Sequence, residues 1–313
     1  MSIPETHNKN KTPRQSPRRI GIFAAAGNAT RLNQNTAHTI GSKEILRVRN
    51  IRTRWHTCMQ RLHPLATADP EIPVGNYLID NFLHGGVDEC IIVTRPEKVD
   101  LLNYYSAKSI GNMQLKRLAV GPTPGTPWTV AHALQSALER YEPEQKQNSA
   151  LANATNLTFA LGFPDIVTAP ENVFHSLFSQ LDNTDCDAVL GLFRVSETRK
   201  YDMVHFESSA THRKHVMGID IKPDDSELEW TWVCAVWTVA FSRYLIDYTN
   251  SQADSTPKSC SNGEVYIGDI LLSAIREGFK IDCLCLENGT VLDIGTPADL
   301  ELARSAEMEK LFS

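Results

Sequence analysis

The sequence predicts an α/β fold, a Rossmann-like mixed, mostly parallel sheet flanked by helices. Three observations predict it. Apolar or β-branched runs alternate along the chain with segments of helical periodicity, which is the pattern of strands joined by crossover helices. Each helical segment carries one apolar stripe, as expected of a helix that packs on a sheet. After about residue 187 the strand-like runs become more frequent, which predicts an antiparallel edge or extension of the same sheet.

The expected strands are short runs of apolar and β-branched residues. They cover residues 20–26, 89–95, 157–163, 187–195, 215–221, 230–241 and 280–287. The expected helices cover residues 76–86, 130–142, 267–278 and 297–312. In the first of them Leu78, Ile79, Phe82 and Leu83 form the stripe, and two glycines end it. The last begins at Pro297, with Thr296 as its N-cap.

The chain of 313 residues is long enough for one large domain, which we expect over 19–313. The polar, basic segment 1–18 predicts a disordered tail, and the aperiodic segment 49–72 a long insertion. The net charge of −6 argues against a nucleic-acid partner. No apolar run is long enough to span a membrane. The seven cysteines lack a CxxC pair, so we expect reduced thiols and a cytoplasmic protein.

Small residues follow the first strand, in 24-AAAGNAT-30, and Arg31 comes next. Such residues let backbone N–H groups approach an anion at the carboxyl end of a strand. Arg31 adds a fork-shaped cation and Lys43 a compact one, both suited to phosphates. The residues alone leave a tight turn with a surface arginine equally open, because the run matches neither the dinucleotide fingerprint nor the P-loop.

Two aspartates follow expected strands. Asp165 comes directly after 157-LTFALGF-163, and Asp293 precedes the turn at Gly295. Carboxylates at such positions hold Mg²⁺ in enzymes that act on nucleoside triphosphates, because Mg²⁺ prefers one or two carboxylates plus phosphate oxygens. A helix cap or a turn residue is the alternative for each, and the sequence does not show that the two converge.

Several motifs in order carry a resemblance over most of residues 20–305. The stretches 24-AAAGNATRL-32 and 42-SKEIL-46 resemble the N-terminal signature of sugar nucleotidyltransferases, nearest to the glucose-1-phosphate thymidylyltransferase branch. The segment 125-GTPWTVAHAL-134 resembles the nucleotide-recognition segment of that family, and 159-FALGFPDIV-167 its metal-aspartate strand. The late stretch 290-TVLDIGTPADLELA-303 is similar to its final motif.

The resemblance implies an enzyme that joins a nucleoside triphosphate, dTTP or UTP, to a sugar 1-phosphate, glucose 1-phosphate in the first place. It implies Mg²⁺ as cofactor and often an assembly of identical subunits. Arg31, Lys43 and Asp165 would be catalytic, and Asp165 with Asp293 would hold the metal. The implied nucleotide contacts are Ala24, Ala25, Ala26, Gly27, Asn28, Ala29, Thr30, Thr129 and His132, and the implied sugar-phosphate contacts are Lys222, Tyr201 and Trp237.

Departures from the family pattern gather on the sugar side. Asp202 stands where the family has glycine, Ile221 where it has glutamate, Tyr266 where it has glutamate, and Gly268 where it has threonine. Arg47 replaces a usual proline. These departures leave two alternatives open. One is a non-catalytic protein that binds a nucleotide or a sugar nucleotide, and the other is a nucleotidyltransferase with a different phosphorylated acceptor.

Overall fold

The computed structural model describes residues 17–27, 41–51, 70–147, 157–209, 212–253 and 264–313. Arg31 and residues 28–30 lie outside the described residues, as do most of the expected tail over 1–18 and the middle of the expected insertion over 49–72. Arg18 already begins the first strand, and the two ends of the insertion pair as short strands, β2 (Arg47–Arg49) and β3 (Glu71–Pro73).

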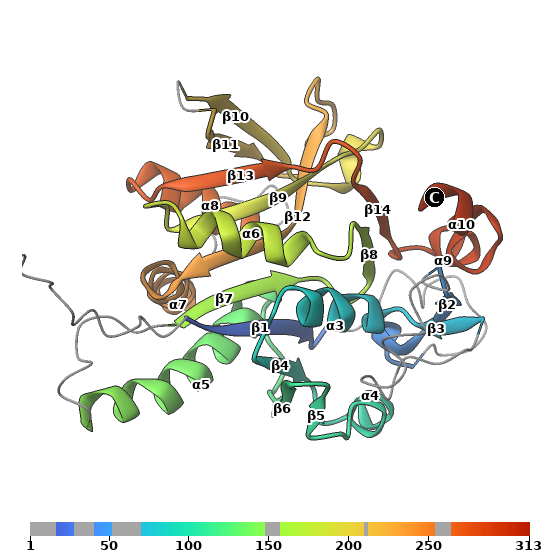
Figure 1. Ribbon diagram of the computed structural model, residues 1–313, viewed down its shortest axis with the longest axis horizontal. Helices are drawn as coiled ribbons and strands as arrows, with labels where there is room; N and C mark the ends of the chain where they lie inside the picture. The colour runs from blue at the N-terminus through green and yellow to red at the C-terminus, as the bar shows by residue number, and fades with distance from the viewer. Residues whose placement is uncertain (1–16, 28–40, 52–69, 148–156, 210–211, 254–263) are drawn as a thin grey trace, which may run out of the picture.

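One large mixed sheet forms the centre of the molecule (Figure 1). Its order is β10-β11-β13-β9-β12-β7-β1-β4-β6-β5. The bounds of these strands are β1 (Arg18–Ala25), β4 (Glu89–Thr94), β5 (Ser109–Ile110), β6 (Met113–Ala119), β7 (Leu157–Gly162), β9 (Ala188–Arg194), β10 (Met203–Ser208), β11 (Lys214–Asp220), β12 (Trp230–Thr238) and β13 (Ile281–Cys285).

The α/β class is confirmed, but the expectation of a mostly parallel sheet is not. Strands β7, β1, β4 and β6 are parallel neighbours, as expected of the N-terminal half. In the C-terminal half, β12 runs antiparallel to both β7 and β9, and β11 runs antiparallel to both β10 and β13. The physical reason is the insertion of one reversed strand, since β12 between β7 and β9 makes both of its pairings antiparallel.

Helices cover both faces of the sheet (Figure 1). Ile22 of β1 belongs to the core cluster that includes α5, α7 and α8, and Phe23 belongs to the cluster that includes α3 and α6. This alternation is the reason that the first strand reads as a continuous apolar run. The helices are α3 (Gly75–His84), α4 (Val99–Tyr104), α5 (Thr126–Gln147), α6 (Val173–Asp182), α7 (Val239–Ala253), α8 (Ile267–Arg276), α9 (Pro297–Arg304) and α10 (Glu307–Leu311).

The C-terminal helix differs from the sequence expectation. Thr296 caps its start as expected, since the Thr296 side chain accepts a hydrogen bond from Asp299 N at 3.3 Å. The helix does not continue over 297–312, because Ser305 takes extended backbone and separates α9 from α10. The Ser305 hydroxyl accepts a hydrogen bond from Glu307 N at 3.1 Å, at the start of α10. Among the described helices, none combines the length and hydropathy required to cross a bilayer.

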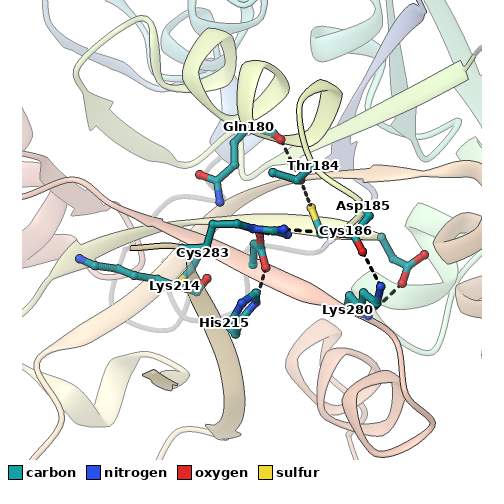
Figure 2. A network of polar contacts seen from close by, with 11 residues as sticks. Gln180, Thr184, Asp185, Cys186, Lys214, His215, Lys280 and Cys283 are labelled. Atoms are coloured by element: carbon teal, nitrogen blue, oxygen red, sulfur yellow. Dashed lines mark hydrogen bonds and ion pairs between the residues drawn. The ribbon is translucent and has the colours of Figure 1, made fainter. Parts of the chain in front are cut away.

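A buried carboxylate joins the outer strands β11 and β13. Asp282 on β13 is fully buried, and its Oδ2 accepts a hydrogen bond from Arg213 Nη2 at 2.8 Å. Its Oδ1 lies 2.7 Å from Nδ1 of His215, which stands opposite Asp282 in the strand register. Figure 2 shows this network, with His215, Asp185 and Lys280 at its edge. Polar contacts to the buried Asp282 carboxylate therefore connect the strands at this side of the sheet.

Candidate active site

A cavity of about 260 Å³ lies beyond the carboxyl ends of β1 and β7, where an α/β sheet binds its ligands. Its lining includes the charged residues Lys43, Asp165, Lys222 and Asp293, which come from four distant segments. A larger cavity of about 690 Å³ lies along β10 and β11, with Glu207 among its lining residues. None of the described residues that line that larger cavity is a lysine or an arginine, so it lacks the charge that a phosphate requires.

The small-residue turn after β1 opens onto the first cavity. Ala24 and Gly27 line it, and an added Cβ at Gly27 would meet no atom within 4 Å. Ala25 and Ala26 are buried instead and belong to the two core clusters on opposite faces. The turn thus offers backbone to a ligand at Ala24 and Gly27, while its other two alanines anchor it in the core.

Lys43 forms an ion pair with Asp165, and both line the cavity. Burial, the largest single influence, lowers the pKa of the Lys43 ammonium, but Asp165, Glu44 and Asp293 together outweigh it and raise that pKa. Lys43 therefore stays charged at neutral pH. The Lys43 side chain keeps 22% of its surface exposed, so the ammonium remains accessible to a ligand.

The short helical turn that carries Lys43, η1 (Lys43–Ile45), is held by contacts with α4 and with the residue just before it, Lys98. Fully buried Glu44 accepts hydrogen bonds from Lys98 Nζ at 3.0 Å on each of its carboxylate oxygens. Ser42 N and Oγ donate to Asp100 at 2.8 and 2.7 Å. These contacts fix the backbone on both sides of Lys43, so its side chain is positioned at the cavity before a ligand binds.

Asp165 and Asp293 are brought together by a small two-stranded sheet. Strands β8 (Ile166–Ala169) and β14 (Thr290–Asp293) pair antiparallel, with Asp293 opposite Ile166. Ile294 N donates to the carbonyl oxygen of Asp165 at 2.9 Å. The structure thus supplies the convergence that the sequence left open. Two aspartates beside a space for phosphate oxygens and water fit Mg²⁺, which needs few protein ligands. Within the described residues no cluster of three or more His, Cys, Asp or Glu offers a fuller metal cage.

Lys222 lines the same cavity, among the positions that depart from the family pattern. Its φ of 40° is in the left-handed region, which a lysine rarely adopts and which marks functional sites. Its Nζ lies 3.7 Å from the ring centroid of Tyr266, a cation–π distance. Tyr201 and Asp202 line the cavity beside them. The side chain of Asp269 accepts from Tyr266 N at 2.8 Å and caps α8.

Besides Ala25 and Ala26, three residues expected from the sequence do not line the cavity. Thr129 is buried one turn into α5, where its hydroxyl lies 3.0 Å from that of Thr123. His132 is exposed on the same helix, and the residue of α5 that lines the cavity is Thr126. Trp237 is buried in the core with its indole N–H donated to Ser242 Oγ at 3.0 Å.

The lining residues that the sequence reasoning missed as contacts include Glu44, Asp202, Trp232 and Tyr266. Position along β12 explains why Trp232 was missed. Trp237 and Trp232 lie on the same strand, but only Trp232 is at the cavity end. The signal for Glu44 was its place beside Lys43, since a buried acid next to a functional lysine favours the charged ammonium.

No protein-family model matches the chain, and no curated protein matches it in sequence. Solved structures match it in fold. A UDP-glucose pyrophosphorylase in complex with UDP-glucose is 17% identical with a TM-score of 0.64, over 94% of this chain and 99% of that one. A UTP-bound UGPase from Acinetobacter baumannii is 15% identical with a TM-score of 0.60, over 92% of each chain.

A third match is a protein assigned as a glucose-1-phosphate thymidylyltransferase from Bacillus anthracis, in complex with sucrose. It is 13% identical with a TM-score of 0.63, over 91% of this chain and 93% of that one. The likeness extends over nearly the whole length of both partners in each comparison, so it concerns the complete fold rather than a shared motif. The chain therefore has the fold of the sugar nucleotidyltransferases, as the resemblance of its motifs led us to expect.

Proposed function

We propose that the protein is a nucleotidyltransferase that joins a nucleoside triphosphate to a sugar 1-phosphate and releases pyrophosphate. One observation carries the proposal, namely the convergence of Lys43, Asp165, Lys222 and Asp293 in one cavity at the carboxyl ends of the strands. The matched folds support it, because two of them are complexes with UDP-glucose and with UTP. We favour dTTP or UTP as the nucleotide and glucose 1-phosphate as the acceptor.

The residues that line the cavity take the following proposed roles. Ala24 and Gly27 give backbone room to the triphosphate, and Lys43 would stabilise negative charge at its α-phosphate. Arg31, outside the described residues, would hold the departing phosphates. Asp165 and Asp293 would hold Mg²⁺, which when bound neutralises phosphate oxygens. Lys222 would bind the phosphate of the acceptor.

The reaction that these residues serve is a direct displacement. A phosphate oxygen of the acceptor attacks the α-phosphorus, the new P–O bond forms, and the bond to the leaving pyrophosphate breaks on the opposite side. Asp165 and Lys43 neutralise each other before the substrates arrive, so neither is proposed as a covalent nucleophile. The protein contributes positioning and charge stabilisation, which account for most catalysis of phosphoryl and nucleotidyl transfer.

Base and sugar contacts are assigned by element. The first turns of α5 would receive the base, with Thr126 at the cavity, Thr129 one turn further and His132 on the exposed side. Tyr201 and Trp232 would receive the sugar, with Trp232 in the role first given to Trp237.

We also propose a cytoplasmic setting and, from the resemblance, an assembly of identical subunits. The thiols of Cys90, Cys186, Cys234, Cys283 and Cys285 are free, which supports a reducing compartment. The assembly is the implication of the family resemblance alone. Size-exclusion chromatography with light scattering measures it directly.

The second candidate function is a non-catalytic protein that binds a nucleotide or sugar nucleotide. The observation that favours it is the group of departures around Lys222, where Asp202 and Tyr266 line the cavity in place of the residues of the family pattern. Such a protein would bind dTTP or UTP with micromolar or better affinity and release no pyrophosphate with any acceptor.

The test is a pyrophosphate-release screen over four nucleoside triphosphates and a panel of sugar 1-phosphates, with and without Mg²⁺. We expect release with at least one pair, dependent on Mg²⁺. Asp165→Asn should abolish release and leave the fold intact by circular dichroism, because the amide keeps the shape and loses the charge. Full activity of Asp165→Asn would contradict the assignment of this carboxylate, and binding without release would favour the non-catalytic alternative.

A further inference from the structure

The carboxylate of Asp202 lies where a side chain at position 268 would otherwise project. A Cβ added to Gly268 would come within 2.4 Å of Asp202 Oδ2 and 2.6 Å of Ile221 Cδ1, closer than real Cβ contacts allow. A larger residue at this position of α8 would therefore require the side chains of Asp202 and Ile221 to shift. Three of the departures from the family pattern, at Asp202, Ile221 and Gly268, therefore pack against one another.

Two buried polar atoms of this wall lack a hydrogen-bond partner among the described residues, namely Asp202 Oδ1 and Trp232 Nε1. Both residues line the cavity, and Trp232 is only 5% exposed. The indole of Trp232 lies close to the Asp202 carboxylate, but the pair lacks hydrogen-bond geometry. A buried polar atom without a partner is destabilising, so a ligand that satisfies both atoms gains affinity at this place.

One of the two atoms is a hydrogen-bond donor and the other is an acceptor. The indole nitrogen of Trp232 is a donor only, and the carboxylate oxygen of Asp202 is an acceptor. A hydroxyl group accepts one hydrogen bond and donates another, so a single hydroxyl satisfies both. An ammonium group has no lone pair for the indole N–H, and a phosphate oxygen has no proton for the carboxylate. The chemistry of the pair selects a hydroxyl.

We propose that Asp202 and Trp232 together bind one hydroxyl group of the acceptor and thereby set acceptor specificity. This inference rests on the proposed function, since it concerns the non-phosphate part of the acceptor whose phosphate Lys222 binds. The acceptor is a phosphorylated sugar or polyol with a hydroxyl at the matching position. An analogue with hydrogen there leaves both protein atoms unpaired, and sites of this kind reject such analogues strongly.

The experiment compares glucose 1-phosphate with its 2-, 3-, 4- and 6-deoxy analogues in pyrophosphate release, for the wild type and Asp202→Ala. We expect one deoxy analogue to lose about 10- to 100-fold in kcat/KM with the wild type, and no more than about twofold with Asp202→Ala. Glu264→Gln is the matched control, because Glu264 lines the same cavity but bonds the Tyr266 hydroxyl at 2.9 Å. This control should keep the wild-type pattern.

The packing of this wall is checked independently with Gly268→Thr, which should be destabilised by its contacts with Asp202 and Ile221 and partly rescued by a second change, Asp202→Gly. Equal kcat/KM ratios for every deoxy analogue in the wild type and Asp202→Ala would overturn the inference and leave the proposed function standing. Calorimetry with UDP and UDP-glucose gives the second readout, in which Asp202→Ala should weaken only UDP-glucose. Failure of the wild type to bind either nucleotide would overturn both.

Discussion

Lys43 and Asp165 neutralise each other across 122 positions of the chain. The two residues have different proposed roles. The Lys43 ammonium would stabilise the α-phosphate, and the Asp165 carboxylate would bind Mg²⁺. Their pairing lets the cavity hold both charges near each other before any ligand binds. The sequence motif predicted each residue separately, whereas the pairing follows only from the fold, because it depends on where η1 lies relative to the end of β7.

Replacing Lys43 tests the role of its charge. Lys43→Ala should lower kcat about 10²- to 10³-fold, because a preorganised charge at a reacting phosphate is worth that much. Affinity for the nucleoside triphosphate should fall far less. Lys200→Ala is the matched control, since Lys200 lines the same cavity and is paired with Glu197 at 2.7 Å. Steady-state kinetics decide, and a kcat of Lys43→Ala within threefold of the wild type would rule out this role.

Asp202 links stability to pH. Burial is the main cause that raises its pKa from 3.8 to about 6, Lys222 opposes the rise, and Asp269 adds to it. The folded protein thus holds this proton more tightly than the unfolded chain, so the free energy of unfolding falls as the pH rises from about 4 to about 6. A rise of roughly 2 units in pKa corresponds to about 3 kcal/mol of stability lost above pH 6.

Asp202→Asn removes this dependence, because the amide does not ionise. The variant should be more stable than the wild type by up to about 3 kcal/mol at pH 7.5 and close to it at pH 4. Urea unfolding at both pH values measures the difference. A stability difference that does not change with pH would show that Asp202 is not the group responsible.

At the scale of elements, the reversed strand β12 decides the architecture. Its sequence, WTWVCAVWT, is apolar throughout and predicts a strand buried on both faces, but nothing in it indicates direction. Direction is set by its neighbours β7 and β9, which are far away in sequence. The alternation of strands and helices therefore predicted the class of fold and the parallel N-terminal half, and the frequent strands after residue 187 predicted an antiparallel edge. Neither pattern could predict that β12 lies between β7 and β9 in the middle of the sheet.

The ionic contacts between β11 and β13 give a prediction at this scale. Arg213→Met leaves the fully buried Asp282 with His215 as its main partner, and should cost about 3 kcal/mol in urea unfolding. Adding Asp282→Leu removes the buried charge as well and should recover most of the loss. A double variant as unstable as the single one would mean that these contacts fix the strands rather than merely neutralise a charge.

Across the whole molecule, the candidate site is assembled from segments that the chain order separates widely. Motif resemblance predicted Lys43, Asp165, Asp293 and Lys222, all of which line the cavity. The contacts on long elements were less predictable. An error of one helical turn separates Thr129 from the cavity, and the placement of Trp237 failed because the sequence does not tell which end of β12 faces the ligand. Asp202 was visible only as a departure from a pattern.

The reverse reaction tests the central claim most directly. Incubation with pyrophosphate, Mg²⁺ and either UDP-glucose or dTDP-glucose should yield the nucleoside triphosphate and glucose 1-phosphate in equal amounts, resolved by ion-exchange chromatography. Asp165→Asn should yield neither product while remaining folded. Formation of both products only by the wild type is the predicted result. A wild-type protein that binds the sugar nucleotide and forms no triphosphate from it would contradict the claim that this cavity is a nucleotidyltransferase site.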